Sequence, residues 1–140
     1  MPETIPRSDH EYLRVKAVNT NGRRQLVMLG ISYGDPVYFS LQFQDDDESF
    51  SCEAPDAFTA FNTARKQYEP KGWRFLCNGA RRDCYAFGSQ LAVDLGENVY
   101  QLVKGRPASN EDLVGIFWDA DESAIGTVNE QRACYEAWCK

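Results

Sequence analysis

The sequence has little histidine, no long apolar run and no export signal. Its 140 residues contain one histidine, His10, in a polar N-terminal stretch. One histidine makes a Ser-His-Asp triad or a Cys-His pair hard to assemble. The apolar runs are only a few residues long, far below the roughly 20 that span a bilayer, and the first residues lack a signal core. We expect a soluble, unexported, cytoplasmic protein.

Closely spaced cysteine pairs are also missing. The five cysteines are Cys52, Cys77, Cys84, Cys134 and Cys139. An odd number leaves at least one thiol unpaired, and without an export signal the default is reduced thiols. Structural zinc sites usually use pairs such as C-x2-C, whereas the nearest pairs here are C-x4-C and C-x6-C. Zinc is therefore the less favoured interpretation, and we expect no bound metal.

The glycine motifs of nucleotide-binding proteins do not occur. The chain has no G-x-G-x-x-G, no G-x-x-x-x-G-K-[ST] and no G-x-S-x-G. These patterns bring backbone N–H groups against phosphates or present a serine nucleophile at a sharp turn. We expect no cofactor, and we expect that the protein is not an enzyme.

Positive charge is absent from two windows of the chain. Residues 34–64 contain seven acids and residues 107–131 contain six, without any Lys or Arg. If the windows meet on one face, that face repels nucleic acid and attracts a basic protein partner; acidic loops that are merely solvated are the alternative. The candidate partner-binding residues are Asp45, Asp46, Asp47, Glu48, Asp119, Asp121 and Glu122.

The run Asp45–Glu48 places four consecutive acids directly after a predicted strand. A calcium loop alternates its ligands and includes a turn glycine, and this run does neither. A hydrolase needs one carboxylate in an apolar pocket that raises its pKa, which adjacent solvated acids do not provide. A solvated turn or a partner-facing patch is favoured.

The first third of the chain predicts three strands. Residues 11–18 and 37–44 alternate apolar with polar side chains, and residues 25–33 lie between them. Asn21-Gly22 is the strongest short hairpin signal, and the Gly-Asp-Pro sequence at 34–36 marks a second turn. We expect a three-stranded antiparallel meander with one buried face.

Two helices and several short strands are predicted next. Residues 54–70 place Pro55 and Asp56 at the helix start, followed by an apolar stripe. Residues 127–139 begin with a capping box, Thr127 and Glu130. The stripe of the first helix is Phe58, Phe61, Ala64 and Tyr68, and the face of the second is Cys134, Ala137 and Trp138. Further strands are expected at 73–77, 84–88, 99–103 and 113–118, with a short helix capped by Ser109 as the alternative near the last. The fold class is α+β, a single domain over residues 1–140, mostly antiparallel sheet with one central and one C-terminal helix.

The stretch GWRFLCNGARRDCYAFGSQ, residues 72–90, predicts a hairpin with a turn at Asn78-Gly79 and a polar tip at Arg81, Arg82 and Asp83. The tip is a secondary candidate for anion or partner binding. The functional alternative is a small enzyme or ligand-binding domain in which the two arginines lower the pKa of Cys84. Direct nucleic-acid binding through the six bases between residues 65 and 82 is less favoured, because the chain has a net charge of −6.

The segments GWRFLCNGARRDCYAFGSQLAVDLGENVYQL, EDLVGIFWDAD and TVNEQRACYEAWC, in the last half of the chain, carry a resemblance. Together they resemble small bacterial immunity proteins of polymorphic toxin loci, including those of contact-dependent growth inhibition systems. The resemblance implies a cytoplasmic α+β protein that binds a cognate toxin domain and blocks it. Many such toxins are nucleases with basic surfaces, which an acidic inhibitor can occupy in place of nucleic acid. No site residue follows from the resemblance.

Overall fold

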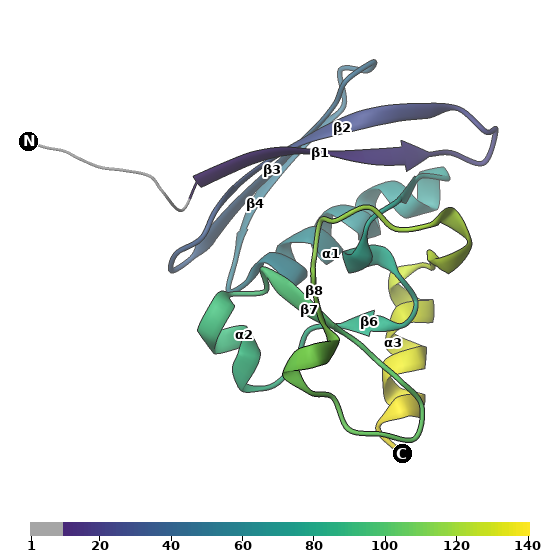
Figure 1. Cartoon of the computed structure of the whole chain (residues 1–140). Coiled ribbons are helices and arrows are strands. Elements are labelled where there is room, and N and C mark those ends of the chain that lie inside the picture. Colours follow the sequence, from purple (N-terminus) through teal and green to yellow (C-terminus); the bar gives the residue numbers. More distant parts are fainter. Residues whose placement is uncertain (1–9) are drawn as a thin grey trace, which may run out of the picture.

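Four strands near the N-terminus form an antiparallel meander that curves over the rest of the molecule (Figure 1). The computed structural model describes residues 10–140. The strands are β1 (His10–Val18), β2 (Arg24–Ser32), β3 (Val37–Phe43) and β4 (Ser49–Ala54), and β5 (Arg74–Phe75) pairs with β1 at the other edge. The predicted three-stranded meander is confirmed. The prediction missed β4, whose Ser- and Glu-containing sequence has a weak strand signal.

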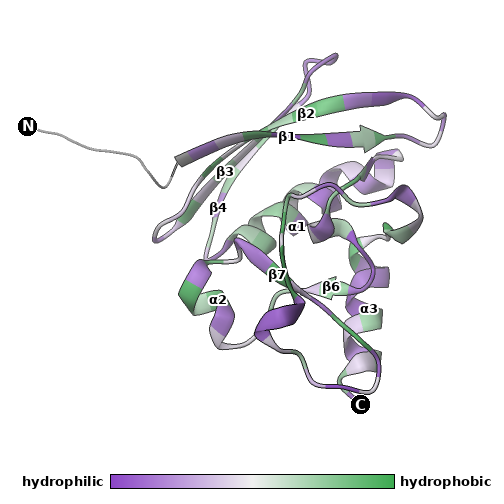
Figure 2. Ribbon diagram, viewed as in Figure 1, coloured by the Kyte–Doolittle hydropathy of each residue, from purple (hydrophilic) through white to green (hydrophobic). Residues whose placement is uncertain are grey.

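The sheet has one buried and one exposed face. Val37, Phe39, Leu41 and Phe43 on β3 are buried, and the residues between them are exposed. Figure 2 shows the matching alternation of hydrophobic and hydrophilic residues along the strands. This period of two is what a sheet with one solvated side requires.

The buried face packs against α1 (Ala57–Tyr68). Asp56 is the N-cap and accepts a 2.8 Å hydrogen bond from the backbone N–H of Thr59, so the helix begins later than the predicted residue 54. All four residues of the predicted stripe are buried. The helix continues into a 3-10 turn, η1 (Glu69–Lys71), and ends at Gly72, whose φ of 98° favours glycine.

The predicted hairpin over residues 72–90 is wrong. The strand β5 pairs with β1, whereas β6 (Cys84–Tyr85) pairs with β7 (Asn98–Gln101) in a second sheet. The Asn78-Gly79 dipeptide between them is buried in a 3-10 turn, η2 (Asn78–Ala80), instead of turning in solvent. Close packing explains this use of glycine, because a β-carbon at Gly79 would lie 2.6 Å from Cγ1 of Ile116.

The second sheet has the order β6-β7-β8. Ser109 does form a capping box, over the 3-10 turn η3 (Asn110–Asp112), and β8 (Leu113–Gly115) follows it directly. Both alternatives for this region are therefore present, but the strand ends three residues before the predicted 118. Helix α2 (Ser89–Asp94) was not predicted; it is short and none of its residues is buried.

The C-terminal helix α3 (Val128–Trp138) begins with the predicted capping box of Thr127 and Glu130. The indole N–H of Trp138 donates to the carbonyl oxygens of Val103 and Arg106, at 3.0 and 3.2 Å. The docked face differs from the prediction, because Ala137 is exposed and Gln131 is the buried residue of the helix. Two antiparallel sheets together with three helices give an α+β fold, as expected.

Candidate functional site

The acidic loop between β3 and β4 is partly tied to the β1–β2 hairpin. The side-chain amide of Gln25 donates a 3.0 Å hydrogen bond to Asp46, and Arg23 lies 3.5 Å from the same carboxylate. Glu48 pairs with Lys71 at 3.6 Å. Asp45 and Asp47 are exposed and their carboxylates form no ion pair within residues 10–140. Of the four candidates in this loop, two are therefore left open to a partner.

The second group of candidate acids surrounds the 3-10 turn η4 (Glu122–Ala124). Asp121 caps this turn, and hydrogen bonds from the hydroxyl and backbone N–H of Ser123 lower the pKa of its carboxyl group. Asp119 lies 3.5 Å from Lys16, and Glu122 lies 2.6 Å from Arg24. All three acids are exposed.

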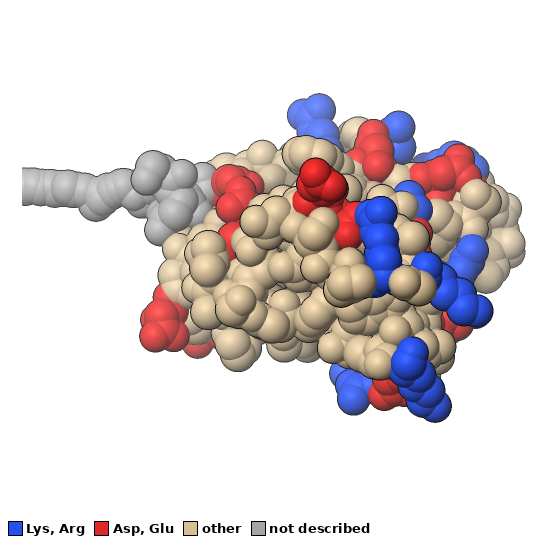
Figure 3. Space-filling model, turned by 60° about the horizontal axis from the view of Figure 1, so that its bottom comes forward, with Lys and Arg blue, Asp and Glu red and all other residues tan. Residues whose placement is uncertain are grey.

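The two acidic windows approach each other at the β1–β2 hairpin. The consecutive residues Arg23 and Arg24 pair with Asp46 of one window and Glu122 of the other. These bases break the acidic surface into patches, and on the face in Figure 3 acidic and basic side chains are interspersed. Exposed ion pairs of this kind are weak, so the carboxylates can exchange their partners for those of another protein.

The arginines of the predicted polar tip are bound within the fold. Arg81 donates two hydrogen bonds, of 2.8 and 2.9 Å, to Asp83. Arg82 donates to the carbonyl oxygens of Ser123 and Ile125, both at 2.6 Å. Two other bases between residues 65 and 82 also have partners within the fold. Arg65 is fully buried and donates to Glu69, and Arg74 donates to backbone carbonyls. The tip is thus bound to the loop before α3 and to Gln101 of β7.

The thiol of Cys84 is buried, and this burial raises its pKa to about 12 despite the opposing charge of Arg81. Burial also raises the pKa of the Cys77 thiol to about 12. At neutral pH both are thiols, whereas a cysteine nucleophile reacts as the thiolate. All five cysteines are free.

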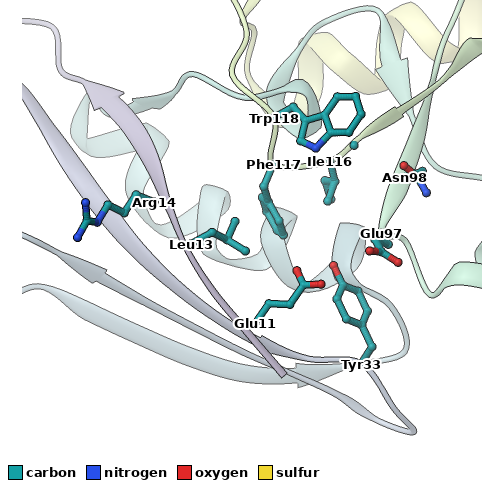
Figure 4. Close-up of a pocket in the computed structure, with 10 residues that line it drawn as sticks. Glu11, Leu13, Arg14, Tyr33, Glu97, Asn98, Ile116, Phe117 and Trp118 are labelled. Carbon is teal, nitrogen blue, oxygen red and sulfur yellow. The ribbon is translucent and has the colours of Figure 1, made fainter. Parts of the chain in front are cut away.

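A pocket that no motif predicted opens between β1 and the β7–β8 sheet (Figure 4). Its volume is about 330 Å³. Glu11 from the start of β1, Tyr33 from the end of β2 and Glu97 before β7 point their polar ends toward one another, and Arg14 points away. Trp118 stands at the rim with 67% of its surface exposed. Leu13, Ile116 and Phe117 supply apolar lining.

The pocket is electronegative. Burial raises the pKa of Tyr33 far above its usual range, and the neighbouring charges of Glu11, Glu97 and Asp94 add to the effect. Burial also raises the pKa of Glu97, again with help from Glu11 and Asp94. The carboxylates of Glu11 and Glu97 and the hydroxyl of Tyr33 have no hydrogen-bond or ion-pair partner in the described part of the chain. The two carboxylates of the lining are therefore without a hydrogen-bond donor.

A signal for this pocket is present in the strand pattern. Glu11 has the same parity as Leu13, Val15 and Ala17, so it is a charged residue on the inward face of β1. Tyr33 continues the inward parity of Ile31. Glu97 and Trp118 come from distant segments, and nothing in the local sequence indicates that they join the other two.

Within residues 10–140, no group of three or more His, Cys, Asp and Glu side chains is arranged to hold a metal ion. No helix in that range has the length and apolar character needed to cross a bilayer. No family model matches this chain, and a search of curated proteins found no match either.

Proposed function

We propose that this protein is a cytoplasmic, immunity-like inhibitor that binds a cognate bacterial toxin domain and occludes its basic active or substrate-binding surface. The acidic residues at the β1–β2 hairpin supply the electrostatic attraction. Asp45, Asp47 and Asp121 are the charges that we expect to contribute most, because none of them has a basic partner within residues 10–140.

One observation carries this proposal. Most of the clustered bases are hydrogen-bonded within the fold, namely Arg65, Arg74, Arg81 and Arg82. Six of the seven candidate acids are exposed at the surface. The six bases between residues 65 and 82 are therefore a poor nucleic-acid surface. The charges left on the outside favour a basic protein, for which complementarity gives fast and specific association.

The test is a titration against the toxin domain encoded by the neighbouring reading frame. The reversal of Asp45 and Asp47 to Lys should weaken binding by about tenfold or more, since close interfacial charge pairs couple by about 1.5 kcal/mol or more. Glu53→Lys is the matched control, because Glu53 is also an exposed acid but lies on β4, away from the hairpin. Unchanged affinity in the double variant would remove the acidic loop from the mechanism.

A further inference from the structure

The pocket of Figure 4 is large enough to receive a long side chain. Its volume of about 330 Å³ lies at the lower end of the range of ligand sites. Leu13, Ile116 and Phe117 give it apolar walls, and the polar ends of Glu11, Tyr33 and Glu97 converge within it. A side chain with an apolar stem and a polar end group would place the stem against the apolar walls and the end group among these polar ends.

The charges inside the pocket require a cationic head. Two carboxylates and a phenol face one another, and Arg14, the one basic residue of the lining, points away. The raised pKa of Glu97 has burial as its first cause and the charges of Glu11 and Asp94 as the next. A bound cation relieves this repulsion and gives each free acceptor a donor.

The rim favours a planar cation. Trp118 is 67% exposed. Its indole lies close against Gly115, because a β-carbon at residue 115 would lie 2.6 Å from the ring atoms Cε2 and Nε1. A guanidinium stacks on such a ring, and its five N–H donors reach acceptors on several sides at once. An ammonium group has three donors and no flat face to stack on the indole. No group of three or more His, Cys, Asp and Glu side chains among residues 10–140 is arranged to hold a metal ion.

We propose that this pocket receives the side chain of one arginine of the protein partner, with Glu11 and Glu97 accepting hydrogen bonds from the guanidinium and Trp118 covering it. This inference rests on the proposed function and names one partner residue, an arginine, that the inhibitor would bind. A buried arginine is a common hot spot of protein interfaces, and here it adds short-range affinity to the longer-range attraction of the acidic loop.

The probe is N-acetyl-arginine amide, compared with N-acetyl-citrulline amide, which has nearly the same shape without the charge. Binding is followed by NMR through the indole N–H signal of Trp118, assigned with a Trp118→Phe variant. A single side chain should bind in the millimolar range. We expect Glu11→Gln and Glu97→Gln each to weaken binding by about tenfold, since a hydrogen bond between charged groups exceeds that factor. The control Glu53→Gln should bind like the wild type.

Three results would overturn the inference: no shift of the Trp118 signal up to about 50 mM arginine amide, an equal response to the citrulline compound, or full binding by both pocket variants with native circular dichroism. These outcomes are separable from failure of the proposed function. If the toxin domain binds, the acidic-loop variant binds it more weakly and the pocket does not bind the arginine probe, then only the proposed arginine pocket is wrong. If the pocket takes arginine but no toxin domain binds, the immunity role is wrong and the site stands.

Discussion

Nη1 of Arg65 donates a 2.8 Å hydrogen bond to Oε1 of Gln131, joining α1 to α3 through side chains that are 0% and 1% exposed. The same guanidinium donates to Glu69 at 2.7 Å and to the carbonyl oxygen of Gly126 at 2.8 Å. The amide of Gln131 donates in turn to the carbonyl of Gly79 at 2.8 Å. One buried cation thus connects the central helix, the η2 turn and the C-terminal helix.

Replacing this cation should cost much of the stability. We expect Arg65→Met to lower the free energy of unfolding by about 3–5 kcal/mol, because Glu69 and several carbonyl groups lose their partner inside the protein. Arg132→Met is the matched control, since Arg132 also pairs with a glutamate four residues later, at 3.1 Å, but in solvent. It should change stability by less than about 0.5 kcal/mol. Similar urea midpoints for the two variants would show that the buried network is not stabilising.

The glycine of the η2 turn should not tolerate a methyl group. In Gly79→Ala the new β-carbon would lie 2.6 Å from Ile116 and 3.1 Å from Phe61, both buried. Overpacking of this kind costs about 1–3 kcal/mol. Gly34→Ala is the comparison, because its nearest contact is an ordinary 3.6 Å, and we expect it to be neutral or slightly stabilising. Thermal unfolding of both variants measures the difference, and equal melting temperatures would contradict the packing at Gly79.

The buried thiols should make the fold sensitive to alkali. The pKa of Cys84 is about 12 against an ordinary 9.0, so between these values the folded state keeps a proton that the unfolded chain releases. The contribution of this thiol to the free energy of unfolding is therefore fully present below pH 9 and is lost as the pH rises toward 12. At one pH unit above 9 the loss is roughly 1.4 kcal/mol per thiol. The slope of unfolding free energy against pH should be shallower in Cys84→Ala. A wild-type slope in that variant would mean that Cys84 ionises freely in the folded protein.

Thiol labelling of the native protein tests the same burial independently. Cys139 is exposed and should react first with iodoacetamide at pH 8, whereas Cys77 and Cys84 should stay unmodified until the protein unfolds. Mass spectrometry of proteolytic fragments identifies the labelled positions. Early modification of Cys84 would instead revive the hypothesis of a reactive cysteine.

Local patterns predicted those elements whose determinants lie close together in the chain. Three local patterns each predicted an element that the structure contains. They are the alternation in residues 11–18, the stripe from Phe58 to Tyr68, and the capping box of Thr127 and Glu130. The Asn78-Gly79 dipeptide led to a wrong prediction, because its local preference is a hairpin turn. The contact of Gly79 with Ile116 arises only in the folded protein. Long-range packing overrode the local signal.

The candidate site shows the same limit. The acidic windows could be read from the charge distribution, but their ion pairs with Arg23 and Arg24 depend on how the loops pack beside the hairpin. Glu11 was detectable as a charge on the inward parity of β1. Its convergence with Glu97 and Trp118 depends on the placement of the second sheet against the first, which no local pattern encodes.

Association kinetics test whether the exposed acids attract a basic toxin domain. Stopped-flow association of the two proteins should slow steeply as salt is raised from about 20 to 500 mM, with a much smaller change in dissociation, because long-range attraction acts on the encounter. The Asp45→Lys, Asp47→Lys double variant should associate more slowly and depend less on salt. An association rate that is independent of salt, and equal in the wild type and the variant, would contradict the account.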